Sequence, residues 1–321
     1  MQAAYDGDLL QLETLLDASA DVLATDHQGL TALFYAVLSD HHDIVTTLLE
    51  HGQRDLAMMA APNNVTCLYI AAQNGSIRTV RQLADVGGPD LLHMATDGGA
   101  TCLYIASQQG FADIVQDLIA RSPDLLRMVA RNGFSCLHVA CQHGHLAVAE
   151  ALAQAGGASL LHLPARTGLT CLHVACEHGC ADVAEMLVWA GGPALARLRA
   201  EDGSSALLCA CREGHAAAAG AVLRAGDEAL LCGRELQNDE QVDGALVRRS
   251  GYVGVVGALL ESGHLNVAKA LVEGEREAGL AGLRRAWRGQ LAGACRRGQA
   301  GLALALLGGR CQKGGGPGES A

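Results

Sequence analysis

Thr66-Cys67-Leu68-Tyr69-Ile70-Ala71 and Thr170-Cys171-Leu172-His173-Val174-Ala175 are two of six related phrases in this chain of 321 residues. The six phrases begin at Thr31, Thr66, Thr101, Ser135, Thr170 and Ser205, so successive phrases start 35, 35, 34, 35 and 35 residues apart. A fixed period of this size indicates a stack of similar supersecondary elements rather than a globular enzyme core. Such a stack predicts a surface that binds another molecule.

A turn residue follows the final Ala of each phrase by four positions. These turn residues are Asp40, Gly75, Gly110, Gly144, Gly179 and Gly214. Apolar residues then return at helical spacing, as in Ile114, Val115, Leu118 and Ile119. Each repeat is therefore predicted to hold a helix of about nine residues, a tight turn, a second helix and a loop. The Thr or Ser that opens each phrase is predicted to cap the first helix, because its hydroxyl can accept from an unpaired N–H of the first turn.

Equivalent positions of successive repeats carry equivalent apolar residues. The column eight residues past the turn residue contains Leu15, Leu48, Leu83, Leu118, Leu152, Leu187, Val222, Leu271 and Leu306. One repeat cannot bury both apolar helix faces by itself, so stacking is expected to make each repeat cover its neighbour.

The phrase Thr170 to Ala175, followed by Glu177-His178-Gly179, resembles the signature of the ankyrin repeat. The resemblance is strong over residues 26–226 and implies an all-α ankyrin-repeat solenoid of about nine stacked helix-turn-helix units joined by hairpin loops. Cys or Ala stands where the family usually has Pro, and Phe or Tyr replaces the usual His in the first three phrases. The period exceeds the family's usual length of about 33 by about two residues. We interpret the additional residues as a short turn that places a Leu pair beneath the second helix.

The repeat pattern divides the chain into five segments. Residues 1–25 are predicted to be a partial N-terminal repeat or cap. Either a shortened cap begins the chain here, or the chain is a fragment of a longer product whose start is missing. Six regular repeats occupy residues 26–226, a polar insertion occupies residues 227–250, and two degenerate or capping repeats occupy residues 251–307. The Gly-rich tail, residues 308–321, is expected to be disordered.

Composition and charge restrict the function classes. Apolar runs are too short for a membrane-spanning helix of about 18 residues. Residues 1–280 carry 16 Lys and Arg against 33 Asp and Glu, whereas residues 281–321 carry 7 against 1. The acidic body disfavours nucleic acid as a partner. The Cys residues recur at equivalent positions of stacked repeats, about 8–10 Å apart, which is beyond disulfide reach. We expect reduced thiols and a cytoplasmic monomer, with the nucleus as the alternative location.

Two clusters of Cys and His residues could either bind a metal ion or pack in the core. Cys136, His138, Cys141 and His143 repeat one unit later as Cys171, His173, Cys176 and His178. Residues five apart on a helix point about 140° apart, so the thiols cannot converge on one ion. We predict no metal, no cofactor and no catalytic residue. The family resemblance implies a structural role for His138 and His173, whose ring nitrogens would bond the neighbouring loop. Trp189 is predicted to be a packing residue, and glycine pairs such as Gly191-Gly192 to end second helices.

The resemblance also implies where a partner lies, because ankyrin repeats usually bind in the concave groove formed by hairpin tips and the exposed side of the first helix. Fourteen residues of this chain match those positions: Gln73, Asn74, Gln108, Gln109, Arg131, Phe134, Gln142, His143, Arg166, Leu169, Glu177, His178, Arg212 and Glu213. Phe134 is a large apolar residue where a solvent-facing one is expected. Phe134→Ala and Arg131→Ala are each predicted to weaken the binding of a partner without a change in thermal stability.

The sequence favours a non-catalytic scaffold that binds a protein or peptide partner in this groove. The alternative is a regulatory or targeting segment of a larger catalytic protein, such as a kinase, a channel or a ubiquitin-ligase adaptor. A third hypothesis is a metal- or redox-responsive protein that acts through the Cys residues.

Overall fold

The computed structural model describes residues 1–224, which form helix pairs joined by hairpin loops. Contacts divide the chain into an N-terminal block of residues 1–174 and a C-terminal block that begins at residue 175. The expected insertion at residues 227–250, the degenerate repeats at residues 251–307 and the tail at residues 308–321 lie outside the described residues.

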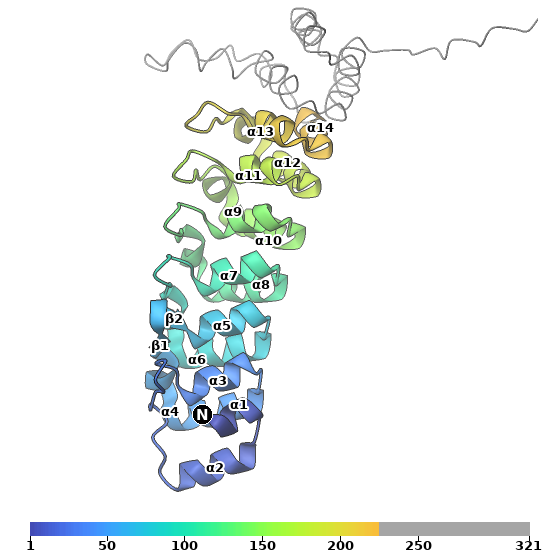
Figure 1. Ribbon diagram of the computed structural model, residues 1–321. Helices are drawn as coiled ribbons and strands as arrows, with labels where there is room; N and C mark the ends of the chain where they lie inside the picture. Colours follow the sequence, from blue (N-terminus) through green and yellow to red (C-terminus); the bar gives the residue numbers. More distant parts are fainter. Residues whose placement is uncertain (225–321) are drawn as a thin grey trace, which may run out of the picture. The chain divides into compact units, whose positions relative to one another are not determined.

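Each repeat has a first helix, a tight turn and a second helix, as predicted. The pairs are α1 (Gln2–Asp6) and α2 (Leu9–Asp17), α3 (Ala32–Leu38) and α4 (His42–Met58), α5 (Cys67–Asn74) and α6 (Ile77–His93), α7 (Cys102–Gln109) and α8 (Ala112–Arg121), α9 (Cys136–His143) and α10 (Leu146–Leu161), α11 (Cys171–Glu177) and α12 (Ala181–Arg197), and α13 (Ala206–Glu213) and α14 (Ala216–Arg224). Within the N-terminal block, first helices pack on first helices and second helices on second helices. Its hairpin loops project on one side (Figure 1).

Short elements complete the loops. Two-residue strands β1 (Ala60–Ala61) and β2 (Val65–Thr66) pair antiparallel around η1 (Pro62–Asn64), and single bridges close three other hairpins at equivalent positions. The 3-10 helix η2 (Pro123–Arg127) follows α8.

The hydroxyl that opens each phrase caps the first helix in most repeats. Thr66, Thr101, Ser135 and Ser205 each accept from the backbone N–H three residues later. Thr31 is the exception, because its buried hydroxyl has no hydrogen-bond partner among the described residues. The capping prediction is therefore confirmed for these four residues and wrong for Thr31.

The glycine at the turn position is required by the next repeat as well as by its own backbone. Gly110 has φ +85°, and a Cβ there would lie 2.6 Å from the ring of His145. That ring hydrogen-bonds the carbonyl of Gln108 at 2.8 Å. Asp40 occupies the same turn position with φ +59°, and the next repeat brings Ser76 instead of a ring. The Ser76 hydroxyl donates to the Asp40 carboxylate.

The additional residues of each repeat form the predicted extra turn. Gly88 has φ +66° and ends the regular part of α6, after which Leu91 and Leu92 are buried at 1% and 3% exposure. A Cβ on Gly87 would lie 2.4 Å from Leu91, so the first glycine of the pair permits close approach and the second permits the reversal. The predicted Leu pair and the helix-ending role of the glycine pair are confirmed here.

The core consists of the predicted apolar columns. Leu48, Leu83, Leu118, Leu152, Leu187 and Val222 are at most 1% exposed. Leu15 stands in the same column but is 44% exposed. Leu23, the counterpart of Leu56 and Leu91, is 40% exposed. In the described structure both leucines belong to the first repeat, where no earlier repeat covers them.

The described helices give no sign of a membrane span, since none within residues 1–224 combines sufficient length with sufficient apolar character.

Candidate partner-binding surface

The first helices expose their last turn, and we call this surface the first-helix face. It consists of the two residues before each turn residue. In the N-terminal block these are Tyr5 and Asp6, Leu38 and Ser39, Gln73 and Asn74, Gln108 and Gln109, and Gln142 and His143. In the C-terminal block they are Glu177 and His178, and Arg212 and Glu213. All fourteen are exposed or half-buried, because the preceding turn of each helix carries the buried Ala and its neighbours.

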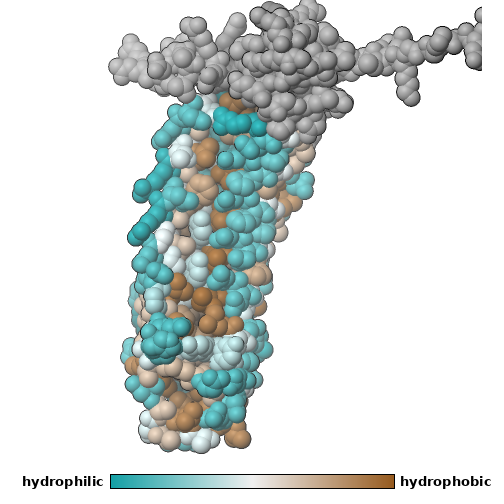
Figure 2. Space-filling model, viewed as in Figure 1, coloured by the Kyte–Doolittle hydropathy of each residue, from teal (hydrophilic) through white to brown (hydrophobic). Residues whose placement is uncertain are grey.

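Neighbouring repeats of the N-terminal block are in contact at these positions. The Asn74 side chain donates to the Val37 carbonyl at 3.3 Å, and the His145 ring contacts the Gln108 carbonyl. Because α5, α7 and α9 pack side by side, the predicted amide residues near their C-terminal ends follow one another along one face of this block. Figure 2 shows apolar residues over these first helices, with polar residues on either side.

The hairpin tips supply a second row of exposed residues. The Arg131 N–H donates to the Gly98 carbonyl at 2.9 Å, and the Arg166 N–H donates to the Asn132 carbonyl at 3.3 Å. These backbone hydrogen bonds link each tip to the tip before it. Within residues 1–224, the exposed side chains of Arg131 and Arg166 make no hydrogen bond or ion pair.

A buried histidine joins one repeat to the next loop. The Ser135 N–H donates to Nδ1 of His138, so the ring proton lies on Nε2 and is donated to the Leu169 carbonyl at 3.1 Å. Burial lowers the pKa of His138 to about 4, which keeps the ring neutral. His173 repeats the Nδ1 contact with Thr170. The structural contact expected of His138 is present.

Phe134 differs from its expected role. Its ring stacks on His138 with centroids 5.2 Å apart, and the residue is half-buried. Because Phe134→Ala would uncover the His138 ring, we now expect this substitution to lower thermal stability, in contrast to the prediction from sequence. Leu169 is also half-buried, and its carbonyl is the acceptor for His138.

The second helices carry polar residues that bind one another. Asp117 accepts from Arg81 and from Arg121, each at 2.7 Å, and Arg121 also donates to Asp85 at 2.6 Å. The Gln82 amide donates to the Thr46 hydroxyl of the preceding repeat at 2.7 Å. This surface therefore satisfies many of its own charges and dipoles.

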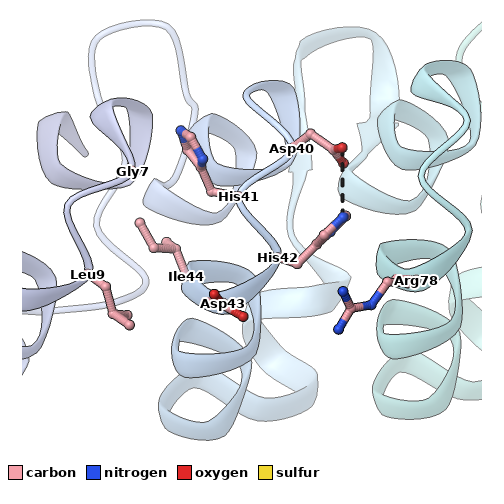
Figure 3. Close-up of a pocket in the computed structure, with 8 residues that line it drawn as sticks. All are labelled: Gly7, Leu9, Asp40, His41, His42, Asp43, Ile44 and Arg78. Carbon is pink, nitrogen blue, oxygen red and sulfur yellow. Dashed lines mark ion pairs between the residues drawn. The ribbon is translucent and has the colours of Figure 1, made fainter.

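A pocket of about 270 Å³ lies at the turn between α3 and α4. Figure 3 shows the aligned pair Asp40 and His42, whose carboxylate and Nε2 are 3.7 Å apart. Nδ1 of His42 lies 2.8 Å from the Thr79 hydroxyl. An acid, a histidine and a hydroxyl in this order resemble a catalytic triad. However, Thr79 is 1% exposed and the acid–histidine distance exceeds hydrogen-bond length, so we interpret the cluster as a contact between repeats.

The exposure of Trp189 contradicts a prediction from the sequence. We expected it to pack, but it is 83% exposed on α12. Its position lies two residues past the buried Leu187, on the opposite side of the helix.

None of the cysteines in residues 1–224 forms a disulfide, and most of them are buried. Burial raises the pKa of Cys102 and Cys136 to about 12, so neither is a thiolate at neutral pH. Cys180 is half-buried, and burial raises its pKa as well. No cluster of three or more metal-binding side chains occurs in residues 1–224.

Sequence reasoning missed the apolar end of the first-helix face. Tyr5 is 55% exposed and Leu38 is 47% exposed, at the position that holds Gln73 in the next repeat. The signal was available, because both residues lie two positions before a turn residue, as the predicted glutamines do.

Comparisons with known proteins agree with this architecture. Family models described as ankyrin repeats match residues 1–95, 88–162 and 137–188, which together cover residues 1–188. A segment of 75 residues is 33% identical to diacylglycerol kinase zeta of Rattus norvegicus; it covers 23% of this chain and 8% of that relative. Among solved structures, the ankyrin repeat domain of Bcl-3, a member of the IkappaB protein family, gives a TM-score of 0.55 at 22% identity. That match covers 64% of this chain and 91% of the other, and it supports the fold alone.

Proposed function

The chain belongs to the ankyrin-repeat family, and we propose that it is a non-catalytic scaffold that holds a protein or peptide segment against the first-helix face. Hairpin tips that carry Arg131 and Arg166 form the border of the proposed site. Fold alone does not assign a function, so the proposal depends on the properties of this surface.

The contrast between the two helix surfaces carries the proposal. On the second helices, the two guanidinium groups of Arg81 and Arg121 are paired with the carboxylates of Asp85 and Asp117. On the other side, Gln73, Gln109 and Arg131 are exposed, and their side chains have no partner within residues 1–224. Groups without internal partners lose only water when another molecule binds, whereas paired groups would first have to separate.

The amide side chains suit an extended segment. Gln73 and Gln108 lie on adjacent repeats, and each side chain provides both a donor and an acceptor. An extended peptide presents backbone N–H and C=O groups, which such amides can bind without selecting one sequence. Arg131 and Arg166 add charged donors, which favour a carboxylate-bearing flank at this end of the partner.

Two matched variants test the proposal. The face variant changes Gln73, Gln109, Arg131 and Arg166 to Ala. The control variant changes four exposed residues of α8 and α10 to Ala, namely Asp113, Gln116, Glu150 and Gln154. We expect proteins captured by the wild-type chain to be lost from the face variant and kept by the control. Equal capture by both variants, or loss only from the control, would place the binding surface elsewhere.

The match to diacylglycerol kinase zeta supports a second candidate, in which these repeats regulate or target a larger catalytic protein. The 33.2 kDa mass calculated from the sequence provides the test. An immunoblot of the natural source with an antibody against residues 1–224 should show a band near that mass if the chain acts alone. A much larger band that also contains a catalytic domain would favour the second candidate.

We also propose that the chain works as a monomer in a reducing compartment, the cytoplasm or the nucleus. None of the nine described cysteines forms a disulfide and eight of them are buried, as expected where disulfides do not form. Light scattering of the reduced protein should give the mass of one chain, and a stable dimer would contradict the monomer. Imaging of the tagged chain tests the compartment.

A further inference from the structure

The N-terminal end of the first-helix face carries a cluster of aromatic and aliphatic side chains. We define the aromatic patch as Tyr5, Tyr35, Leu38 and Ile70. The Tyr5 and Tyr35 rings meet edge to face with centroids 6.2 Å apart. Leu38 lies one turn after Tyr35 on α3, and Ile70 holds the position of Tyr35 on the adjacent helix α5. All four residues are exposed or half-buried.

The exposure of this patch is not required by the fold. The position of Tyr5 and Leu38 is filled by Gln73, Gln108 and Gln142 in the next three repeats. A polar residue is therefore compatible with the same helix turn. Exposed apolar residues that stand next to one another, in place of polar counterparts, mark interaction sites. Four of the five Tyr residues of the chain lie within residues 1–104.

The border of the aromatic patch is acidic. Asp6 follows Tyr5 directly, and the Tyr35 hydroxyl donates to the Asp26 carboxylate at 2.6 Å. This hydrogen bond lowers the pKa of Asp26 and favours its ionised form. Asp40 lies two residues past Leu38. Residues 1–53 contain nine Asp and Glu and no Lys or Arg, so no basic side chain of this segment other than histidine offsets the border.

We infer that the aromatic patch docks a cationic segment of a partner protein, one in which bulky aliphatic residues alternate with Arg or Lys. The aliphatic side chains would cover Leu38 and Ile70, and the cations would lie against the Tyr faces and the acidic border. This inference rests on the proposed function and specifies the partner chemistry at one end of the site. A second copy of the chain fits less well, because the acidic border would face its own like charges.

The probe is a short fluorescein-labelled peptide in which Arg and Leu alternate, added to the full chain and followed by fluorescence anisotropy. Two control peptides replace every Arg by Glu or every Leu by Ser. We expect binding of the Arg–Leu peptide, weaker binding of the Ser control and none of the Glu control, with affinity that falls as salt is added. Binding of the Glu control with equal affinity would overturn the inference.

The patch variant is Tyr5→Gln with Leu38→Gln, which introduces the residue found at this position in the next three repeats. The control variant is Leu10→Gln with Trp189→Gln, which removes two residues of 76% and 83% exposure outside the patch. Both should keep the wild-type circular dichroism and thermal midpoint. The patch variant should bind the Arg–Leu peptide about tenfold more weakly. An unchanged affinity would overturn the inference.

Two further measurements test whether the aromatic patch is covered by residues 281–321 of the same chain or by a second copy of the chain. A full chain with Arg284, Arg285, Arg288, Arg296 and Arg297 changed to Gln should bind the peptide as the wild type does. A tenfold gain would show that residues 281–321 of the chain occupy the patch, which overturns the assignment to a partner. A dimer that the patch variant abolishes would overturn it in favour of a second copy. The face variant separates the two proposals, because it leaves the aromatic patch intact.

Discussion

The Nε2 atom of His138 lies 3.1 Å from the carbonyl oxygen of Leu169, and through this contact a buried ring ties the first helix of one repeat to the loop of the next. His138 is 0% exposed, and protonation of Nδ1 would remove the hydrogen bond that this atom accepts from the Ser135 N–H. Burial and this hydrogen-bond arrangement make neutrality of His138 a condition of the stacked structure.

Stability should therefore fall on mild acidification. The folded pKa of His138 is lowered to about 4, while an unfolded His titrates near 6.5. Between these values the unfolded chain binds the additional proton, so the free energy of unfolding decreases as the pH falls from about 6.5 to 4. The contribution is fully present above 6.5.

His138→Tyr provides the comparison, since Tyr69 and Tyr104 fill the same position. Urea unfolding at pH 7 and pH 5 should show a loss about 2 kcal/mol smaller in this variant than in the wild type. An identical loss in both proteins would mean that His138 does not titrate as the contacts indicate.

The turn residue of one repeat contacts the residue that follows the turn in the next repeat, and this contact predicts the result of a double-mutant experiment. Gly110→Asp should destabilise the chain by about 2 kcal/mol, because of positive φ and the clash with the His145 ring. With His145→Ser present, the pair resembles Asp40 and Ser76, and the cost of Gly110→Asp should fall by about 1 kcal/mol. Thermal unfolding of the four proteins measures the coupling, and strict additivity would contradict this account.

The charge network on the second helices should contribute modestly. Burial favours the neutral form of Asp117, but hydrogen bonds and charges from Arg121 and Arg81 outweigh it and lower its pKa. Asp117→Asn should reduce the free energy of unfolding by about 1 kcal/mol at neutral pH, with a smaller effect at high salt. The contribution depends on the ionised carboxylate and should disappear as the pH falls below about 4. A loss that is the same at low and high salt would argue for packing instead.

Thiol reactivity should follow burial. In the native protein, iodoacetamide should modify Cys180 before Cys67, Cys102 or Cys136, because the buried thiols have raised pKa values and lie out of reach. Peptide mass spectrometry after brief labelling gives the order. Rapid modification of Cys136 in folded protein would support the redox-responsive hypothesis.

The features that could be predicted from the sequence are those that recur with the repeat period. Leu83, Leu118 and Leu152 recur because each must fill the same space between repeats, so their burial could be read from spacing. The Cys and His clusters were interpreted as packing residues because a helix directs their side chains apart, so they cannot converge on one metal ion. The exposure of the first repeat could not be predicted in this way, because Leu15 fits the column pattern but is 44% exposed.

The contacts and exposure of individual side chains could not be predicted from the repeat pattern. Thr31 matches the cap position but its hydroxyl has no partner among the described residues, and the half-buried ring of Phe134 stacks on His138. Trp189 was predicted to pack near the end of a second helix, yet its place two residues past the buried Leu187 leaves it exposed. Residues at solvent-facing positions differ from repeat to repeat because packing does not constrain them, so the repeat pattern did not predict a role for Tyr5 and Leu38.

Hydrogen–deuterium exchange of the full chain with a captured protein partner tests the central claim most directly. The account predicts slower exchange, on partner binding, in the first helices α3, α5, α7 and α9 and in the tips around Arg131 and Arg166. The second helices α6, α8 and α10 should exchange as in the free chain. Protection confined to those second helices, with the first helices unchanged, would contradict the assignment of the binding surface.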